Sequence, residues 1–377
     1  MLFIIAIILF LNGVITSAYT LMITAETTTF WAMLSVNFVF YLGMTQTGII
    51  FSAIMRIAKS EWGRYFSRLG EILTLSFIPV AFITFLIIYI GGTENLFYWA
   101  SPGPSPEHDV GHVSPWLGKG LFLWRTLITM AAFYIMSYIY FRTTLIEDKG
   151  THVSYDIEKR LNLMAGFVMV FYIIANTNVA WDFGMMIIPH WESTIFPPYF
   201  WVGNVFGGTA FLFLLARLFL SQGGKQGIDK EHLDSMGKVL LGFTLLWIYM
   251  FWSQHIVLWY SDLPNLTGPL FKQMSGNYTG TFSTMILALF ILPFFALIFR
   301  RIKLSISGLS ITACIICIGT WTTRYLMILP VFKNGSEPVL ATWTGISLIL
   351  AGLAATYQGR VVTSKSGGTI FARSIFG

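Results

Sequence analysis

Long, unbroken apolar runs separated by short polar stretches dominate this sequence. A helix needs about 20 mostly apolar residues to cross a bilayer, and backbone inside lipid must satisfy its own hydrogen bonds. The runs are too long and too uniformly apolar for the alternating strands of a membrane barrel. They predict an all-α polytopic membrane protein with about ten transmembrane helices, over residues 1–22, 31–55, 69–91, 116–141, 161–182, 199–220, 236–260, 278–299, 305–326 and 340–358.

The positions of the basic residues indicate an orientation. Most of the 23 Lys and Arg residues fall in alternate loops and in the C-terminal tail, including the loop after span 31–55 that begins at Arg56 and ends at Arg68. Cytoplasmic loops are enriched in Lys and Arg, so we expect both termini to be cytoplasmic. No basic residue precedes the first apolar run, which favours a retained helix over a cleaved signal peptide.

The sequence also contains what we interpret as a duplicated unit. Spaced glycines and a terminal Arg characterise both span 31–55 and span 199–220, and a Pro follows seven residues after both Asp182 and Thr323. The second copy begins four helices after the first. Because four is an even number, the two copies cross the membrane in the same direction and are parallel repeats. We therefore expect a first flanking helix, a four-helix bundle with an outer interfacial segment at 183–198, a second four-helix bundle, and a last flanking helix with a cytoplasmic tail, over 1–30, 31–198, 199–335 and 336–377 respectively.

Composition excludes several classes of site. Charged residues make up 11% of the chain, against about 25% in soluble proteins, and the net charge of +6 comes from loop residues, so nucleic-acid binding is not expected. Cys314 and Cys317 have no second pair beside them, so no metal site is predicted. Only His255 of the six histidines lies clearly inside a span, whereas a membrane haem b needs two His ligands. We expect no cofactor in this chain.

Ionisable residues inside membrane spans are costly and usually functional. We predict no catalytic residue, but a proton path is one interpretation of the polar residues near the outer face. Asp182 and Arg125 are alternatively a purely structural ion pair. The candidates for the proton path are Asp182, His255, Arg125, His190, Arg324, Asp262 and Gln254.

Three stretches resemble a known family. Residues 181–196 (WDFGMMIIPHWESTIF) are similar to a Pro-His-Trp-x-Ser-Thr-Ile-Phe signature of the F subunit of alternative complex III. Residues 233–260 and the segment 56–71, with its Arg-Leu-Gly-Glu turn, resemble the same family, and the likeness covers roughly 30–330. This family belongs to the polysulfide-reductase membrane-subunit (NrfD-like) superfamily. Ile188, His255, Asn265 and Thr323 depart from its pattern, because each stands where the family has an acid or a Tyr.

The resemblance implies a non-redox subunit of a quinol:electron acceptor oxidoreductase in the bacterial cytoplasmic (inner) membrane. The subunit would anchor the respiratory complex and translocate protons. Its expected partners are lipid, a homologous NrfD-like membrane subunit, an iron–sulfur subunit and multihaem cytochrome c subunits, so that haem c and iron–sulfur clusters reside in those partners during electron transport.

Two other functions compete with this one. The chain is alternatively the quinone-binding NrfD-like subunit itself, with a quinol near His190, Asp182 and Arg125. A secondary transporter also fits parallel repeats, but such a protein needs a mid-membrane site between broken helices, whereas the ionisable residues here lie toward the outer face.

Overall fold

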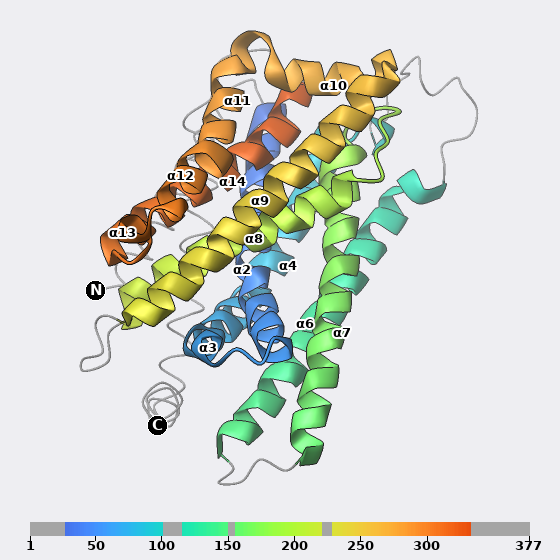
Figure 1. Ribbon diagram of the computed structural model, residues 1–377. Helices are drawn as coiled ribbons and strands as arrows, with labels where there is room; N and C mark the ends of the chain where they lie inside the picture. The colour runs from blue at the N-terminus through green and yellow to red at the C-terminus, as the bar shows by residue number, and fades with distance from the viewer. Residues whose placement is uncertain (1–26, 101–114, 150–154, 221–227, 333–377) are drawn as a thin grey trace.

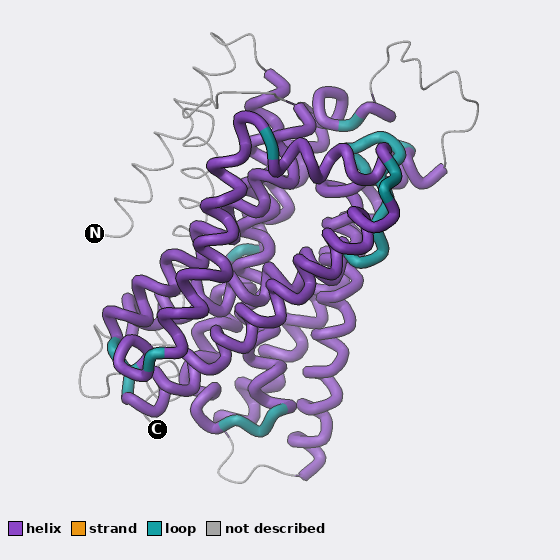
Figure 2. Tube along the Cα trace, turned by 45° about the horizontal axis from the view of Figure 1, so that its top comes forward, coloured by secondary structure: helices purple, strands orange, loops and turns teal. Residues whose placement is uncertain are grey.

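A computed structural model describes residues 27–100, 115–149, 155–220 and 228–332. All regular structure in this part of the chain is helical, and eight of its helices are long and apolar enough to cross a membrane (Figure 2). These helices confirm the predicted class, an all-α polytopic membrane protein. The two outermost predicted spans, 1–22 and 340–358, lie outside the described residues.

The eight spans fall into two sets of four (Figure 1). The first half contains α2 (Thr27–Ile57), α3 (Glu61–Ser76), α4 (Ile78–Ile87), η1 (Ile88–Gly92), α5 (Thr93–Leu96), η2 (Tyr98–Ala100), η3 (Pro115–Leu117), α6 (Lys119–Lys149), α7 (Tyr155–Ala180) and η4 (Trp181–Met185). The second half contains α8 (Phe196–Leu220), α9 (Lys230–Ser261), α10 (Pro264–Met274), η5 (Gly276–Tyr278), α11 (Thr279–Ile286), η6 (Leu287–Ile291), α12 (Leu292–Ile298), α13 (Arg300–Lys303) and α14 (Ile306–Phe332).

Each half closes into a ring of four spans. Helix α2 packs against α3 and α7, and α6 contacts both of those helices. In the second half α8 packs against α9 and α14, and α12 contacts both of those. The halves meet along α2 and α8, each of which also contacts the last span of the other half. This exchange of equivalent contacts is what two parallel repeats produce.

Burial separates the central helices from the peripheral ones. The most apolar window of α2 is 94% buried and that of α8 is 78% buried, whereas the spans around them are buried over 28–50% of the same window. The peripheral helices therefore turn apolar side chains outward, among them Ile90, Ile128 and Leu163. Large exposed apolar surfaces are unusual in soluble monomers, but they suit helices that face lipid.

Close helix contacts depend on the glycines that marked the repeat. A Cβ at Gly48 of α2 would collide with the carbonyl oxygen of Gly70 in α3, and a Cβ at Gly70 would collide with that of Gly48. Small residues at such crossings let membrane helices approach backbone to backbone. Thr74 completes this contact, because its hydroxyl donates to the Thr45 carbonyl at 2.7 Å and accepts from the Ile49 amide at 2.9 Å.

Three spans contain a π-helical turn, at η1, η4 and η6. Such turns are rare and often occur at functional sites, and η4 contains Asp182. Helix α7 thus continues without a break through η4 to Met185, and the irregular chain before α8 covers 186–195. The expected interfacial segment at 183–198 is therefore helical at both of its ends.

The start of the second described span corrects the sequence analysis. We expected Arg68 in a loop and the span to begin at residue 69, but α3 begins at Glu61 and buries Arg68 to 8% exposure. The physical reason is Glu71, one helical turn later, whose carboxylate lies 2.5 Å from the Arg68 guanidinium. Pairing with a carboxylate lowers the cost of placing a charge in the protein interior.

Candidate functional site

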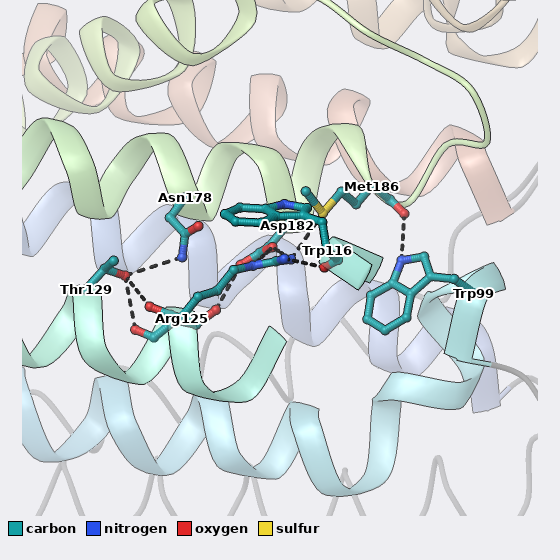
Figure 3. Close-up of polar contacts among 8 residues, drawn as sticks. Trp99, Trp116, Arg125, Thr129, Asn178, Asp182 and Met186 are labelled. Carbon is teal, nitrogen blue, oxygen red and sulfur yellow. Dashed lines mark hydrogen bonds and ion pairs between the residues drawn. The ribbon is translucent and has the colours of Figure 1, made fainter. Parts of the chain in front are cut away.

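Asp182 lies at the centre of the first polar cluster (Figure 3). The π-helical turn η4 places its carboxylate, which is fully buried, against α6. Arg125 donates to Oδ1 through both Nε, at 3.0 Å, and Nη2. Thr126 donates to Oδ2 at 2.8 Å. Both carboxylate oxygens therefore have donors, as a charge in a membrane protein requires.

The rest of the Arg125 guanidinium is equally well surrounded. It donates to the carbonyl oxygen of Trp116 and to the sulfur of Met186, the latter at 3.1 Å. The Trp116 ring lies 4.5 Å from the guanidinium carbon, at cation–π distance. Trp99 donates to the Met186 carbonyl at 3.3 Å, which ties the chain after η4 to the same cluster (Figure 3).

Hydrogen bonds extend this cluster along α6 and α7. Thr129 donates to the Arg125 carbonyl at 2.9 Å, and Asn178 donates to the Thr129 hydroxyl at 3.3 Å. Thr126 and Asn178 are both buried. The polar surface therefore continues from Asp182 toward the middle of the first half.

A second buried carboxylate occurs near the other end of the same ring. Glu71 of α3 is 2% exposed and accepts hydrogen bonds from Ser52 at 2.6 Å, from Arg68 at 2.5 Å and from Thr144 at 3.2 Å. Tyr140 of α6 lies 3.2 Å from the Ser52 hydroxyl. This cluster lies near the end of the bundle that contains the α2–α3 turn and the basic helix α13.

Glu71 was missing from the candidates that the sequence predicted. It lies inside the apolar run 69–91, so an intramembrane carboxylate was visible in the sequence. We grouped it with the Arg68–Glu71 turn and not with the span that it enters. We had expected the ionisable residues of the spans to lie only toward the outer face. The position of Glu71, near the opposite end of the ring from Asp182, shows that this expectation was wrong.

The two carboxylate clusters are joined by polar side chains of α6. Fifteen residues separate Arg125 from Tyr140, which is about 22 Å along a helix. Between them lie Ser137, whose buried hydroxyl has no hydrogen-bond partner among the described residues, and Tyr134, whose buried hydroxyl interacts with Gln46. Gln46 of α2 also has an unpartnered amide nitrogen. Buried polar groups of this kind are usually satisfied by ordered water.

A third polar cluster lies where the two halves meet. Asn176 donates to Gln46 at 2.8 Å, Asn204 donates to Asn176 at 2.9 Å, and Arg324 donates to Asn204 at 2.8 Å. Arg324 is 1% exposed, and its guanidinium carbon lies 4.1 Å from the centre of the Phe200 ring. Within the described chain it forms no salt bridge. Amide dipoles and an aromatic face solvate this cation instead.

The remaining sequence candidates lie apart from these clusters. Gln254 is buried and His255 is half-buried, and both belong to α9 in the second half. His190 and Asp262 are exposed and adopt left-handed backbone conformations, with φ of 55° and 47°. Arg125 and Asp182 are in direct contact, but His190 forms no hydrogen bond or ion pair with either of them.

Comparisons with known proteins add no identification. The chain matches no known family model, and no curated protein is significantly similar to it. The buried carboxylates and the polar residues between them are therefore the main basis for assigning a function.

Proposed function

We propose that this chain is a membrane subunit of a quinol-oxidising respiratory complex, similar to alternative complex III, and that its first half conducts protons. One observation supports the proton path above others. Two buried carboxylates, Glu71 and Asp182, lie near opposite ends of one four-helix ring, and the buried hydroxyls of Ser137 and Tyr134 on α6 lie between them. Chains of acids, hydroxyls and water are the usual proton relays of membrane proteins.

The chemistry of the intervening groups suits proton transfer. A hydroxyl group is both a donor and an acceptor, so Tyr140, Ser137 and Tyr134 can pass a proton on without gaining a net charge. Water between their hydroxyls would complete the hydrogen-bonded line. Glu71 and Asp182 would exchange protons at its two ends, because a carboxylate alternates between accepting and donating.

The two ends of the proposed path have the same arrangement of side chains, with Arg68 beside Glu71 and Arg125 beside Asp182. Each guanidinium binds a carboxylate that also accepts a hydrogen bond from a Thr of α6, namely Thr144 or Thr126. The arginines hold the carboxylates in place and favour their charged state, whereas burial favours the protonated state. A carboxylate under these two opposing influences can bind a proton and release it again, which a relay requires.

The role in a respiratory complex rests on the sequence resemblance. Electron transfer would occur in the partner subunits, and this chain would present its outward apolar faces to lipid and to a homologous membrane subunit. Proton conduction in the first half would then be coupled to quinol oxidation next to it.

Neutralising the Arg125–Asp182 pair tests proton conduction against a purely structural role. Asp182→Asn alone leaves a buried unpaired cation, which is strongly destabilising, whereas Asp182→Asn with Arg125→Gln removes both charges. We expect the double variant to assemble but to translocate fewer protons per electron in liposomes. Glu158→Gln is the matched control, because Glu158 is an exposed acid at the start of α7, the helix that continues through η4 to Asp182. Normal proton-to-electron stoichiometry in the double variant would contradict the relay.

A further inference from the structure

Two adjoining cavities lie in the second half, between the end of α9 and α10, the helix that crosses the end of the bundle (Figure 1). The larger has a volume of about 350 Å³ and is lined mainly by apolar and aromatic side chains, including Trp252, Trp259 and Phe271. The smaller, of about 30 Å³, shares His255 and Leu270 with the first. Ligand cavities range from about 300 to 1,000 Å³, so the larger one is of sufficient size.

The small cavity differs from the large one in its polar lining. Gln254, Gln273 and Thr323 contribute to its wall together with His255. Gln254 is 2% exposed, and its amide oxygen accepts from Ser193 at 2.9 Å. Its amide nitrogen has no partner among the described residues. A buried donor without a partner is costly, so Gln254 is suited to bind an acceptor placed in this cavity.

His255 supplies the complementary group. Its Nδ1 lies 2.8 Å from the carbonyl oxygen of Phe251. A carbonyl oxygen only accepts, so Nδ1 holds the proton and the neutral ring presents Nε2 as an acceptor. The imidazole stacks on the Phe251 ring with the centroids 3.9 Å apart, which fixes its orientation. A hydroxyl between these groups could accept from Gln254 and donate to His255.

We propose that the two cavities bind one lipid-soluble molecule, with a neutral hydroxyl group in the small cavity and its apolar body in the large one. Among the described residues, no Asp, Glu, Lys or Arg lines either cavity, so no charge from this part of the chain balances a phosphate or carboxylate. The small cavity has room for an oxygen atom, since a water needs about 10–15 Å³. Trp252 and Ile256 are 56% and 52% exposed, so the large cavity is reached from the bilayer.

Two kinds of molecule share this chemistry, an isoprenoid quinol and a neutral diacylglycerol. The site is separate from the proposed proton path, which is built on α3, α6 and α7. A variant that loses ligand binding at the two cavities can therefore keep proton conduction in the first half, and the two proposals can fail separately.

Photolabelling of the purified, assembled protein tests the site. A photoreactive quinol analogue and a photoreactive diacylglycerol are added separately, and cross-linked peptides are identified by mass spectrometry. We expect saturable labelling within residues 252–274 by one of the two probes, which also decides between the two kinds of molecule. Gln254→Leu should weaken binding of that probe by about fivefold, the loss expected for one neutral hydrogen bond.

Tyr249→Phe, on an exposed position of the same helix, is the control and should leave labelling unchanged. His255→Phe keeps the stacked ring but removes Nε2, and it provides a second variant should Gln254→Leu fail to fold. Labelling by neither probe, or labelling that both Gln254→Leu and His255→Phe leave unchanged, would overturn the proposal.

Discussion

At the scale of single residues, the first half of the molecule combines fully bonded charges with buried hydroxyls. Asp182 and Arg125 have donors and acceptors on every side. By contrast, Ser137 is buried without a hydrogen bond among the described residues, and Tyr134 is buried with Gln46 as its polar neighbour. A structure built only for stability would replace such hydroxyls by apolar groups. Their retention between two carboxylate clusters is what a hydrated path would require.

Tyr134→Phe should therefore slow proton translocation several-fold without lowering thermal stability. The substitution removes a hydroxyl that interacts with Gln46 among the described side chains and would also bind water in the path. Tyr138→Phe, a 48% exposed position on the same helix, should change neither quantity. The measurements are the acidification rate in liposomes and the melting temperature of the purified protein. An unchanged acidification rate together with a raised melting temperature would indicate that the Tyr134 hydroxyl binds no water and has no role in proton transport.

At the scale of helices, the contact between α2 and α3 holds the Glu71 cluster in place. Gly48 and Gly70 bring the two backbones together, and Ser52 lies one turn farther along α2, where it reaches Glu71 at 2.6 Å. Glycine at this crossing thus determines both the packing and the geometry of the carboxylate.

Gly48→Ala should destabilise the protein by about 1–3 kcal/mol, the usual range for forcing an extra methyl into a packed interior. Gly166→Ala in α7 is the control, because a Cβ there meets no atom within 4 Å. It should be neutral or stabilising by up to about 1 kcal/mol through helix propensity. The free energy of unfolding in mixed detergent measures both. Equal effects of the two substitutions would show that the α2–α3 approach is not tight.

The sequence could predict the spans and one site pair, but not which faces of the helices meet. Length and hydropathy located the eight described spans, and Asp182 and Arg125 were recognisable because they lie inside apolar runs. These helices have apolar side chains on every face, so the periodicity of apolar residues along the sequence does not reveal which face points inward. The alignment of Ser137 and Tyr134 between two carboxylates therefore needed the structure. Arg68 was misplaced because its burial also involves Thr144 of α6, to which it donates at 2.9 Å and which the sequence does not place beside it.

At the scale of the whole molecule, two rings of four spans meet along α2 and α8. Only the first ring contains both carboxylate clusters, while the second has the apolar cavity beside α10. In place of Asp182 the second ring has Thr323, followed by the solvated cation Arg324. The two rings thus have similar helix contacts but different polar interiors, which fits separate roles for them.

Isolation of the tagged chain from native membranes tests its membership of a complex. We expect haem-staining cytochromes c, an iron–sulfur protein and a second membrane subunit to co-purify with it, and quinol oxidation by the assembly. Heat-dissociated and repurified, this chain should show no haem absorption. A stable solitary protein that binds a solute would favour a transporter instead.

The most direct test of proton conduction is the proton-to-electron stoichiometry of the double variant Glu71→Gln with Arg68→Gln in the assembled protein in liposomes. The double variant removes both buried charges, so no unpaired cation remains, and glutamine at position 71 can accept from Ser52 through its amide oxygen but cannot exchange a proton. We expect quinol oxidation to continue with fewer protons translocated per electron, and Glu71→Asp, which keeps a carboxylate, to lose less. An unchanged stoichiometry in a double variant that is fully assembled would contradict a proton path through the first half.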